Sequence, residues 1–163
     1  YDFIKKVYLN GKSSIENISF EIFFGDGRDF LKNNRELEFD AVFQDPFSPS
    51  KNPEMWSVEY FTCIKSHMNE NAILTTYSSA DQIRRAMLEA GLIVGAGPSV
   101  GRKREGTVAS RSAVIEPLDD ERIRNILDNP KSEPYIDRDL SMKREDILFE
   151  RLERIKKKKS EIR

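Results

Sequence analysis

The stretch Asp45-Pro-Phe-Ser-Pro49 combines an acid, two prolines and an aromatic ring in one loop. Proline rings fix φ and carry no backbone N–H, so such a loop is stiff and its carbonyl oxygens stay free as acceptors. An amine nucleophile must present its lone pair in line with the atom that it attacks, and acceptors on its N–H groups set that direction. The residue types of this loop therefore indicate a site for an amine.

Acidic residues follow two of the strand-like stretches. Asp26 comes shortly after the apolar run that ends at Phe24, and Asp45 comes directly after Gln44. Ligands of open α/β sheets bind beyond the carboxyl ends of the strands, so we expect these turns and the one at Tyr77 to form one rim. Acids at such a rim accept hydrogen bonds from a ribose hydroxyl or an exocyclic amine, although Asp26 is also suited to capping the next helix.

The stretch Gly95-Ala-Gly-Pro-Ser-Val-Gly101 is similar to a dinucleotide-binding fingerprint but departs from it in three ways. The third glycine is one residue late, Pro98 occupies the turn, and the chain after Gly101 leads into another strand instead of a helix. We therefore expect no nucleotide site here, and an α/β enzyme with a nicotinamide cofactor is disfavoured.

Two groups of basic residues each have a structural and a functional interpretation. Arg102, Lys103 and Arg104 form a turn that is either a solvated hairpin tip or a contact for phosphate. The run from Lys156 to Lys159 either complements the C-terminal end of a helix dipole or contacts RNA phosphates. The sequence leaves both alternatives open.

Composition limits the classes of protein to consider. The chain has 163 residues, of which 38% are hydrophobic, which is enough for the core of one domain. Its 27 basic and 28 acidic side chains nearly cancel, so any polyanion site must be local. Cys63 and His67 are the only residues of their types, which excludes an internal disulfide and a cysteine-rich or multi-histidine zinc site and favours a reducing, cytoplasmic setting. No apolar run approaches the roughly 18 residues that span a bilayer, so we expect a soluble chain without a membrane partner.

The elements that must position these residues alternate between strand-like and helix-like patterns. This alternation predicts an α/β domain with a largely parallel sheet and an antiparallel hairpin at its edge. We expect strands at 18–24, 40–44 and 72–77, a hairpin of 92–96 with 107–115, and helices at 54–68, 78–91 and 141–163. The first strand should enter a buried sheet. The composition becomes polar and charged after residue 117, so we expect two parts, 1–117 and a charged helical extension, 118–163.

Four stretches, in this order and spacing, resemble the methyltransferase domain of the tRNA 5-methylaminomethyl-2-thiouridine biosynthesis family. They are FFGDGRDFL, FDAVFQDPFSPSKNPEMWSVEYF, ILTTYSSADQIRRAMLEAG and GRKREG, and the resemblance covers roughly residues 20–114. The Asp-Pro-Phe-Ser-Pro loop is more similar to that of stand-alone members than to the Asp-Gly-Phe-Ala-Pro of the bifunctional ones. The resemblance implies a Rossmann-like class I methyltransferase that uses S-adenosylmethionine to methylate the 5-aminomethyl group on wobble 2-thiouridine of certain tRNAs.

The resemblance also implies which residues form the site, without any metal. Catalytic roles fall to Asp45, Pro46 and Phe47, which would flank the methyl group and the incoming amine. The implied cofactor-binding residues are Gly25, Asp26, Gly27, Asp45 and Pro46, with Asp26 and Gly27 on the adenine side. The implied tRNA-binding residues are Lys51, Asn52, Trp56, Tyr77, Arg102, Lys103 and Arg104, because aromatic rings stack on bases and cations bind phosphate. Trp56 is equally suited to being a core residue that opens a helix.

Two parts of the family's cofactor site have no counterpart in the sequence. The glycine-rich loop after the first strand and the ribose-binding acid after the second do not occur, and the strand at 18–24 corresponds to the family's third. We therefore expect the chain to begin within the domain, with the first two strands of the sheet lacking. In the family's strand order, the strands at 18–24 and 40–44 are not neighbours.

Two functions remain open at this point. The first is the tRNA methyltransferase, whose expected partners are the tRNA anticodon loop and a separate enzyme that makes the aminomethyl precursor. The alternative is a non-catalytic RNA-binding or scaffold domain that derives from a methyltransferase.

Overall fold

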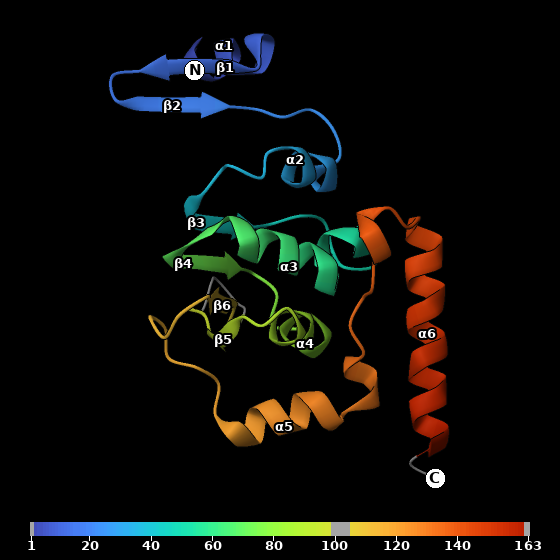
Figure 1. Ribbon diagram of the computed structural model, residues 1–163. Coiled ribbons are helices and arrows are strands. Elements are labelled where there is room, and N and C mark those ends of the chain that lie inside the picture. The colour runs from blue at the N-terminus through green and yellow to red at the C-terminus, as the bar shows by residue number, and fades with distance from the viewer. Residues whose placement is uncertain (1, 99–104, 162–163) are drawn as a thin grey trace.

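The computed structural model describes residues 2–98 and 105–161, in which helices and strands alternate along most of the chain (Figure 1). The basic turn of Arg102, Lys103 and Arg104 lies outside the described residues. In chain order the elements are α1 (Asp2–Asn10), β1 (Lys12–Ile15), β2 (Ile18–Glu21), α2 (Gly27–Asn33), β3 (Phe39–Gln44), the 3-10 helix η1 (Pro53–Trp56), α3 (Val58–His67), β4 (Met68–Thr76), α4 (Asp81–Glu89), β5 (Ile93–Ala96), β6 (Thr107–Ser110), α5 (Asp120–Asp128), the 3-10 helices η2 (Pro130–Ser132) and η3 (Arg138–Leu140), and α6 (Arg144–Glu161).

A four-stranded mixed sheet lies at the centre of the molecule, with the strand order β3-β4-β6-β5. β3 runs parallel to β4, whereas β6 is antiparallel to both β4 and β5. The predicted α/β class is confirmed. β3, β4 and β5 run in the same direction and β6 alone among the described strands of this sheet opposes them, as expected for a largely parallel sheet with an antiparallel hairpin at its edge. Within that hairpin the second strand, β6, lies beside β4, and the first strand, β5, forms the edge.

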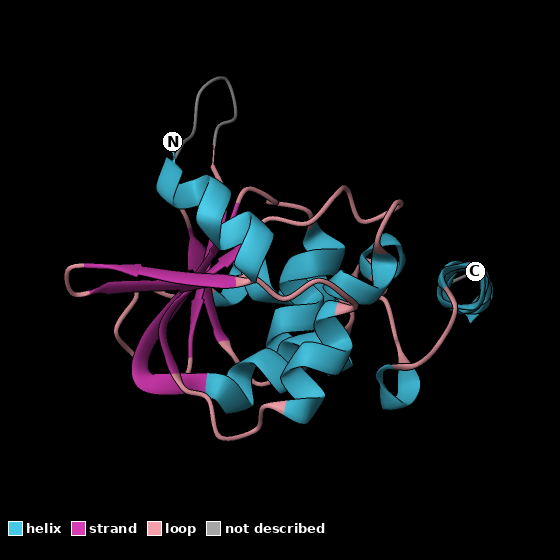
Figure 2. Ribbon diagram, turned by 90° about the horizontal axis from the view of Figure 1, so that it is seen from above, coloured by secondary structure: helices cyan, strands magenta, loops and turns pink. Residues whose placement is uncertain are grey.

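Helices α2, α3 and α4 cover one face of this sheet. Figure 1 labels them, and Figure 2 shows the same arrangement from above. Alternate residues of β4 point toward these helices, so Ala72 and Leu74 are buried while Ile73 is exposed. Phe43 on β3 points the other way and is 82% exposed. The core therefore lies between the sheet and one layer of helices, and the other face of β3 and β4 carries the exposed apolar side chains of Phe43 and Ile73.

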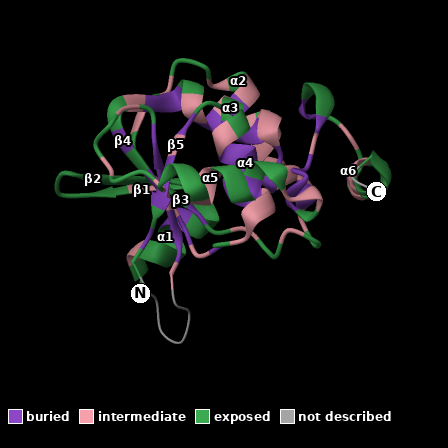
Figure 3. Cartoon of the chain, turned by 90° about the horizontal axis from the view of Figure 1, so that it is seen from below, coloured by how far each residue is buried: buried purple, intermediate pink, exposed green. Residues whose placement is uncertain are grey.

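The strand predicted at 18–24 is not part of the central sheet. β2 pairs only with β1, in an antiparallel ribbon that is separate from the central sheet, and all of its residues are exposed (Figure 3). The ring of Phe20 packs edge-on against Phe3 of α1 at 5.3 Å between centroids. Phe24 packs edge-on against Tyr8 of α1, and Phe23 lies against Phe30 of α2. These contacts leave both rings at least half exposed, which is why the prediction of a buried strand was wrong. The expectation that the strand at 18–24 does not pair with the next one is confirmed.

Local sequence signals account for the bounds of the two central helices. The Ser57 hydroxyl accepts a hydrogen bond from the Tyr60 N–H and caps α3, so the helix predicted from residue 54 begins after a separate 3-10 turn that Pro53 opens. α4 ends as predicted at Gly91, whose φ of +75° is a backbone conformation that glycine adopts without strain. Between these two helices, strand β4 follows α3 without an intervening loop.

The segment after residue 117 packs onto the same core as the rest of the chain. Tyr135, Leu140 and Ile147 belong to the hydrophobic cluster that includes α3 and α4. Tyr135 also forms a parallel bridge with Ser57, at the start of α3. No helix among the described residues is long and apolar enough to cross a membrane.

The carboxylate of Glu133 holds three cations of this region together. It is buried and pairs with Arg85 of α4 at 3.0 Å, with Arg154 of α6 at 3.5 Å, and with Lys158 of α6. Lys158 is part of the lysine run, so at this position the structure shows an internal ion pair. The pairing fastens the last helix to the helix layer.

We predict that Glu133→Ala lowers the free energy of unfolding by about 3 kcal/mol, because it leaves the nearly buried Arg85 guanidinium without its buried carboxylate. Urea denaturation followed by circular dichroism measures the effect. The matched control is Glu153→Ala, which breaks the exposed pair with Lys156 and should leave the urea midpoint nearly unchanged. Equal midpoints for the two variants would contradict the role of Glu133.

Candidate functional site

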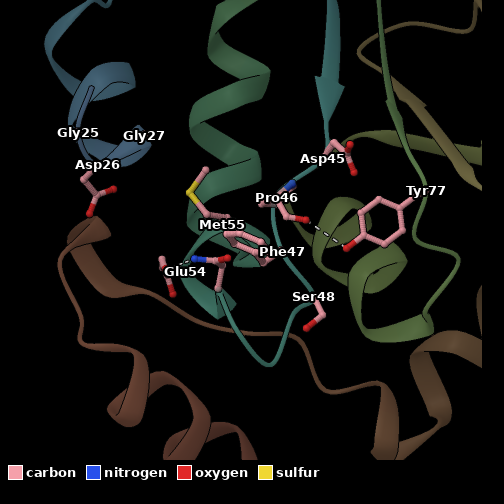
Figure 4. A pocket seen from close by; sticks show the side chains of 11 residues that line it. Gly25, Asp26, Gly27, Asp45, Pro46, Phe47, Ser48, Glu54, Met55 and Tyr77 are labelled. Atoms are coloured by element: carbon pink, nitrogen blue, oxygen red, sulfur yellow. Dashed lines mark hydrogen bonds between the residues drawn. The ribbon is translucent and has the colours of Figure 1, made fainter. Parts of the chain in front are cut away.

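A cavity of about 740 Å³ opens where β3 and β4 end, beside the N-terminus of α2 (Figure 4). It is lined by Gly25, Asp26, Gly27, Asp45, Pro46, Phe47, Ser48, Asn52, Glu54, Met55 and Tyr77. The turns after Phe24, Gln44 and β4 therefore meet at one rim, as expected for the carboxyl edge of an α/β sheet. All five residues of the implied cofactor set and the three residues of the implied catalytic set border this cavity.

The loop that follows β3 is fixed by hydrogen bonds from three directions. The Trp56 indole N–H donates to the carbonyl oxygen of Phe47 at 3.0 Å, and the Tyr77 hydroxyl donates to that of Pro46 at 3.2 Å (Figure 4). Below the loop, the Gln44 side-chain amide donates to the Met55 carbonyl oxygen at 2.6 Å. Two of the loop carbonyls thus hold the loop itself in place, and each keeps one lone pair for a ligand.

The structure places Trp56 in the core. Its side chain is 0% exposed, and its ring meets the rings of Phe61 and Tyr77 edge-on at 6.4 and 5.9 Å between centroids. A ring with no exposed surface cannot stack on an RNA base, so the expectation that Trp56 faces the anticodon loop is corrected. Its indole positions the cavity loop from behind instead. Lys51 is exposed on the same loop, outside the cavity lining.

Asp26 caps α2, which was one of the two roles that the sequence left open. Its carboxylate accepts hydrogen bonds from the Arg28 backbone N–H at 2.9 Å and from the Arg28 guanidinium at 2.7 to 3.1 Å. These hydrogen bonds, and then the charge of the guanidinium, lower the pKa of Asp26, against the opposing effect of partial burial. At neutral pH the group is therefore an ionised acceptor whose charge Arg28 balances.

Arg28 connects this acid to the C-terminal segment. Its guanidinium pairs with the fully buried carboxylate of Asp137 at 2.8 Å, and it also donates to the Met142 carbonyl oxygen. Asp137 in turn accepts the backbone N–H groups of Ser141 and Met142 at 3.0 and 2.7 Å. The two carboxylates raise the pKa of Arg28, which stays charged and holds the turn at Asp26 against the segment before α6.

Tyr77 stays protonated at the other side of the cavity. Burial, and secondarily the negative charge of Asp45, raise the pKa of its hydroxyl. A protonated hydroxyl is the state that donates to the Pro46 carbonyl oxygen. The pair therefore couples the end of β4 to the loop after β3, and the acid of that loop favours the pairing.

Three cavity residues escaped the sequence analysis: Ser48, Glu54 and Met55. The sequence Asn52-Pro-Glu-Met could have indicated Glu54 and Met55. A proline often opens a 3-10 turn, and such a turn places neighbouring residues on the same side of the loop. Met55 also explains Gly27, because a Cβ atom there would lie 3.0 Å from the Met55 methyl group. Asn52 borders the cavity as well, and its amide donates to Glu54 at 3.2 Å.

The cavity residues suit a ligand that carries several N–H donors and a cationic centre. The volume falls within the usual range of roughly 300–1,000 Å³ for small-molecule sites. Asp45 and Glu54 offer carboxylates, and two buried acceptor atoms, Asn52 Oδ1 and Glu54 Oε2, have no hydrogen-bond partner in residues 2–98 and 105–161. Among the described residues, no group of three side chains is arranged to hold a metal ion.

Comparisons with known proteins agree on one family. A family model described as S-adenosyl-L-methionine-dependent methyltransferase matches residues 3–112. The tRNA 5-methylaminomethyl-2-thiouridine biosynthesis bifunctional protein MnmC of Hahella chejuensis is 39% identical over 93 residues, which are 57% of this chain and 15% of that protein. An uncharacterised protein of Methanocaldococcus jannaschii is 31% identical over 162 residues, 98% of this chain and 45% of its own length.

A solved structure supports the same assignment. The crystal structure of MnmC2 from Aquifex aeolicus superposes with a TM-score of 0.82 and 33% sequence identity, over 94% of this chain and 50% of that one. The chain thus spans half or less of the length of each of these similar proteins.

We predict that Asp26→Asn lowers stability at neutral pH and that this effect fades in acid. The folded-state pKa of Asp26 is lowered, so its contribution is complete above the reference value of 3.8 and is lost as the pH falls through the folded-state pKa. Urea midpoints of wild type and variant should therefore differ at pH 7 and converge as the pH falls through the folded-state pKa of Asp26. Asp29→Asn, which alters an exposed acid of the same helix turn, is the control and should lower the midpoint less at pH 7. A gap that is as wide in acid as at neutral pH would contradict the role of Asp26.

Proposed function

Because the chain belongs to the S-adenosyl-L-methionine-dependent methyltransferase family, we propose that it forms part of an enzyme that N-methylates the 5-aminomethyl group of wobble 2-thiouridine in tRNA. The similar proteins from Hahella and Aquifex support the choice of substrate. The acceptor is tRNA in the cytoplasm, and a separate enzyme that makes the aminomethyl precursor is the second expected partner.

One observation carries the proposal most directly. The turn at Gly25, Asp26 and Gly27 and the loop at Asp45, Pro46 and Phe47 line the same cavity, although about twenty residues separate them in the chain. A methyl transfer to an amine needs both a site for the methyl donor and acceptors that aim the amine. The turn at Gly25 to Gly27 would supply the site for the methyl donor, and the loop at Asp45 to Phe47 would supply the acceptors for the amine. Both therefore lie in a single cavity.

The residues that would hold the cofactor lie on the α2 side of the cavity. Gly25 and Gly27 line this side of the cavity, and the ionised Asp26 carboxylate accepts hydrogen bonds from an exocyclic amine. When bound, S-adenosylmethionine supplies a methyl group on a sulfonium centre, which an amine lone pair can attack. The acids that line this cavity suit its positive charge.

The residues that would hold the amine lie on the β3 side. The Asp45 carboxylate and the second lone pair of the Pro46 carbonyl oxygen accept the N–H groups of the amine, which leaves its lone pair pointing along the line of transfer. The ring of Phe47 is 78% exposed beside them and is available to pack against the uracil base. Tyr77 contributes indirectly, by holding the Pro46 carbonyl.

Contacts to the tRNA backbone would come from cations near the cavity mouth. Lys51 is exposed on the cavity loop, and the basic turn of Arg102, Lys103 and Arg104 follows β5 in the sequence. Such cations neutralise phosphates and make binding dependent on salt, but they carry no base specificity. Specificity for the modified uridine then rests on the cavity itself.

We predict that Asp45→Ala lowers kcat by about 10² to 10⁴ in the complete natural protein, because a positioned acceptor is lost from the transition state. The measurement is transfer of a labelled methyl group from S-adenosylmethionine to tRNA that carries 5-aminomethyl-2-thiouridine. Asp40→Ala, at the opposite end of the same strand and outside the cavity, is the control and should keep wild-type turnover.

Near-normal turnover of Asp45→Ala would remove Asp45 from the mechanism. A wild-type protein that binds this tRNA but transfers no methyl group would favour the non-catalytic RNA-binding domain over the enzyme.

A further inference from the structure

Two buried acceptor atoms of cavity-lining residues have no hydrogen-bond partner in the part of the chain that the structure describes. Glu54 Oε2 and Asn52 Oδ1 are both inaccessible to solvent and accept no hydrogen bond within the described residues, whereas the other carboxylate oxygen, Glu54 Oε1, accepts from the Asn52 amide at 3.2 Å. Buried polar atoms are nearly always paired in folded proteins, because an unpaired one has lost its hydrogen bonds to water without replacement. Both atoms belong to residues that line the cavity, so a ligand with N–H groups would complete them.

The charges around the cavity indicate the sign of that ligand. Asp26, Asp45 and Glu54 are its acids, and no lysine or arginine is among the described residues that line it. Arg28 balances Asp26 at 2.7 Å, but neither Asp45 nor Glu54 has an ion pair in the described part of the chain. Asp45 is exposed to water, whereas Glu54 has one buried carboxylate oxygen. A buried carboxylate oxygen without a cation is costly, and a cationic ligand offsets that cost. The cavity is therefore matched to a positively charged donor.

The two acceptors and the residues of the adenine side belong to different elements of the chain. Asn52 and Glu54 follow Asp45, Pro46 and Phe47 on the same loop, which η1 anchors through the Met55 carbonyl and the Trp56 indole. The turn at Gly25 to Gly27 comes from a different element, at the start of α2. An N–H donor that reaches Glu54 is thus bound by the loop that would bind the amine.

We propose that Glu54, oriented by Asn52, is a specificity-determining residue that binds the substrate's aminomethyl group in its protonated, cationic form. This inference rests on the proposed function and adds to it the charge state that the site selects on binding. An aliphatic amine has a pKa of about 10, so it arrives as an ammonium ion with three N–H donors at neutral pH. One of these protons leaves to water or to a cavity carboxylate before transfer, which frees the lone pair that attacks the methyl group. Glu54 Oε2 accepts one of them in a charge-assisted hydrogen bond, which a neutral group of the same size cannot replace in full.

The experiment compares two anticodon-stem-loop RNAs that differ only at the wobble position. One carries a 5-aminomethyl group and the other a 5-hydroxymethyl group, which is of nearly the same size and uncharged. Binding of each RNA to the complete natural protein is measured at saturating S-adenosylhomocysteine, which has no methyl group to transfer. We expect wild type to prefer the aminomethyl RNA and Glu54→Gln to reduce that preference by about tenfold or more, since the side chain keeps its shape and loses its charge.

Two further variants complete the design. Glu121→Gln makes the same change at an exposed acid of α5, outside the cavity, and should keep the wild-type preference. Glu54→Asp retains the charge and should retain part of the preference, which keeps the test open if Glu54→Gln lowers stability. The affinity for S-adenosylhomocysteine, measured by calorimetry, should change by less than about twofold in Glu54→Gln, because the inference assigns this acid to the amine.

An unchanged preference in Glu54→Gln would overturn the inference. So would a loss of S-adenosylhomocysteine affinity with the RNA preference intact, since Glu54 would then belong to the cofactor. If wild type shows no preference between the RNAs but does methylate the aminomethyl tRNA, the inference fails and the proposed function stands. If it neither prefers nor methylates that RNA, both fail.

Discussion

The parallel pairing of β3 with β4 is the constraint on which the rest of the site depends. Gln44 is in register with Thr76, so the two strands end at the same edge and the next residues, Asp45 and Tyr77, emerge side by side. The hydroxyl of Tyr77 can therefore reach the Pro46 carbonyl. A shift of the register by one residue would reverse the faces of β3 and move the loop away from the α2 turn. The cavity, its acids and its glycines all follow from this common edge.

Electrostatic balance then decides which acids of the rim remain available to a ligand. Arg28 lies between Asp26 and the buried Asp137, so one rim acid is neutralised and tied to the C-terminal segment. Asp45 and Glu54 have no such partner within the described chain, and their charges face the cavity. The same C-terminal segment is held elsewhere by the buried Glu133. The charged tail is thus part of the scaffold around the site, because burial makes its ion pairs strong constraints on geometry.

Much of the fold was predictable because short-range signals specify it. The apolar runs that end at Gln44 and Thr76 became β3 and β4, and Gly91 ended α4 as its freedom at positive φ requires. The same reasoning failed for the stretch that forms β2. Its apolar residues indicated a buried strand, but the strand lies in an exposed ribbon. Periodicity reports which side chains are apolar. Whether a partner covers them depends on residues far away in the sequence.

The sequence by itself determined the chemistry that the site can offer: the acid, prolines and aromatic ring of the loop at Asp45 to Phe47, and the family to which they belong. Only the tertiary structure decided how those groups are used. Trp56 could have faced RNA, but its ring is buried against Phe61 and Tyr77, and its indole N–H donates to the Phe47 carbonyl oxygen. Glu54 carried no signal of its own and became a cavity acid because a 3-10 turn carries it to the rim. Residue types set what a group can bind, whereas its burial and its partners, which long-range packing alone establishes, set whether it is free to do so.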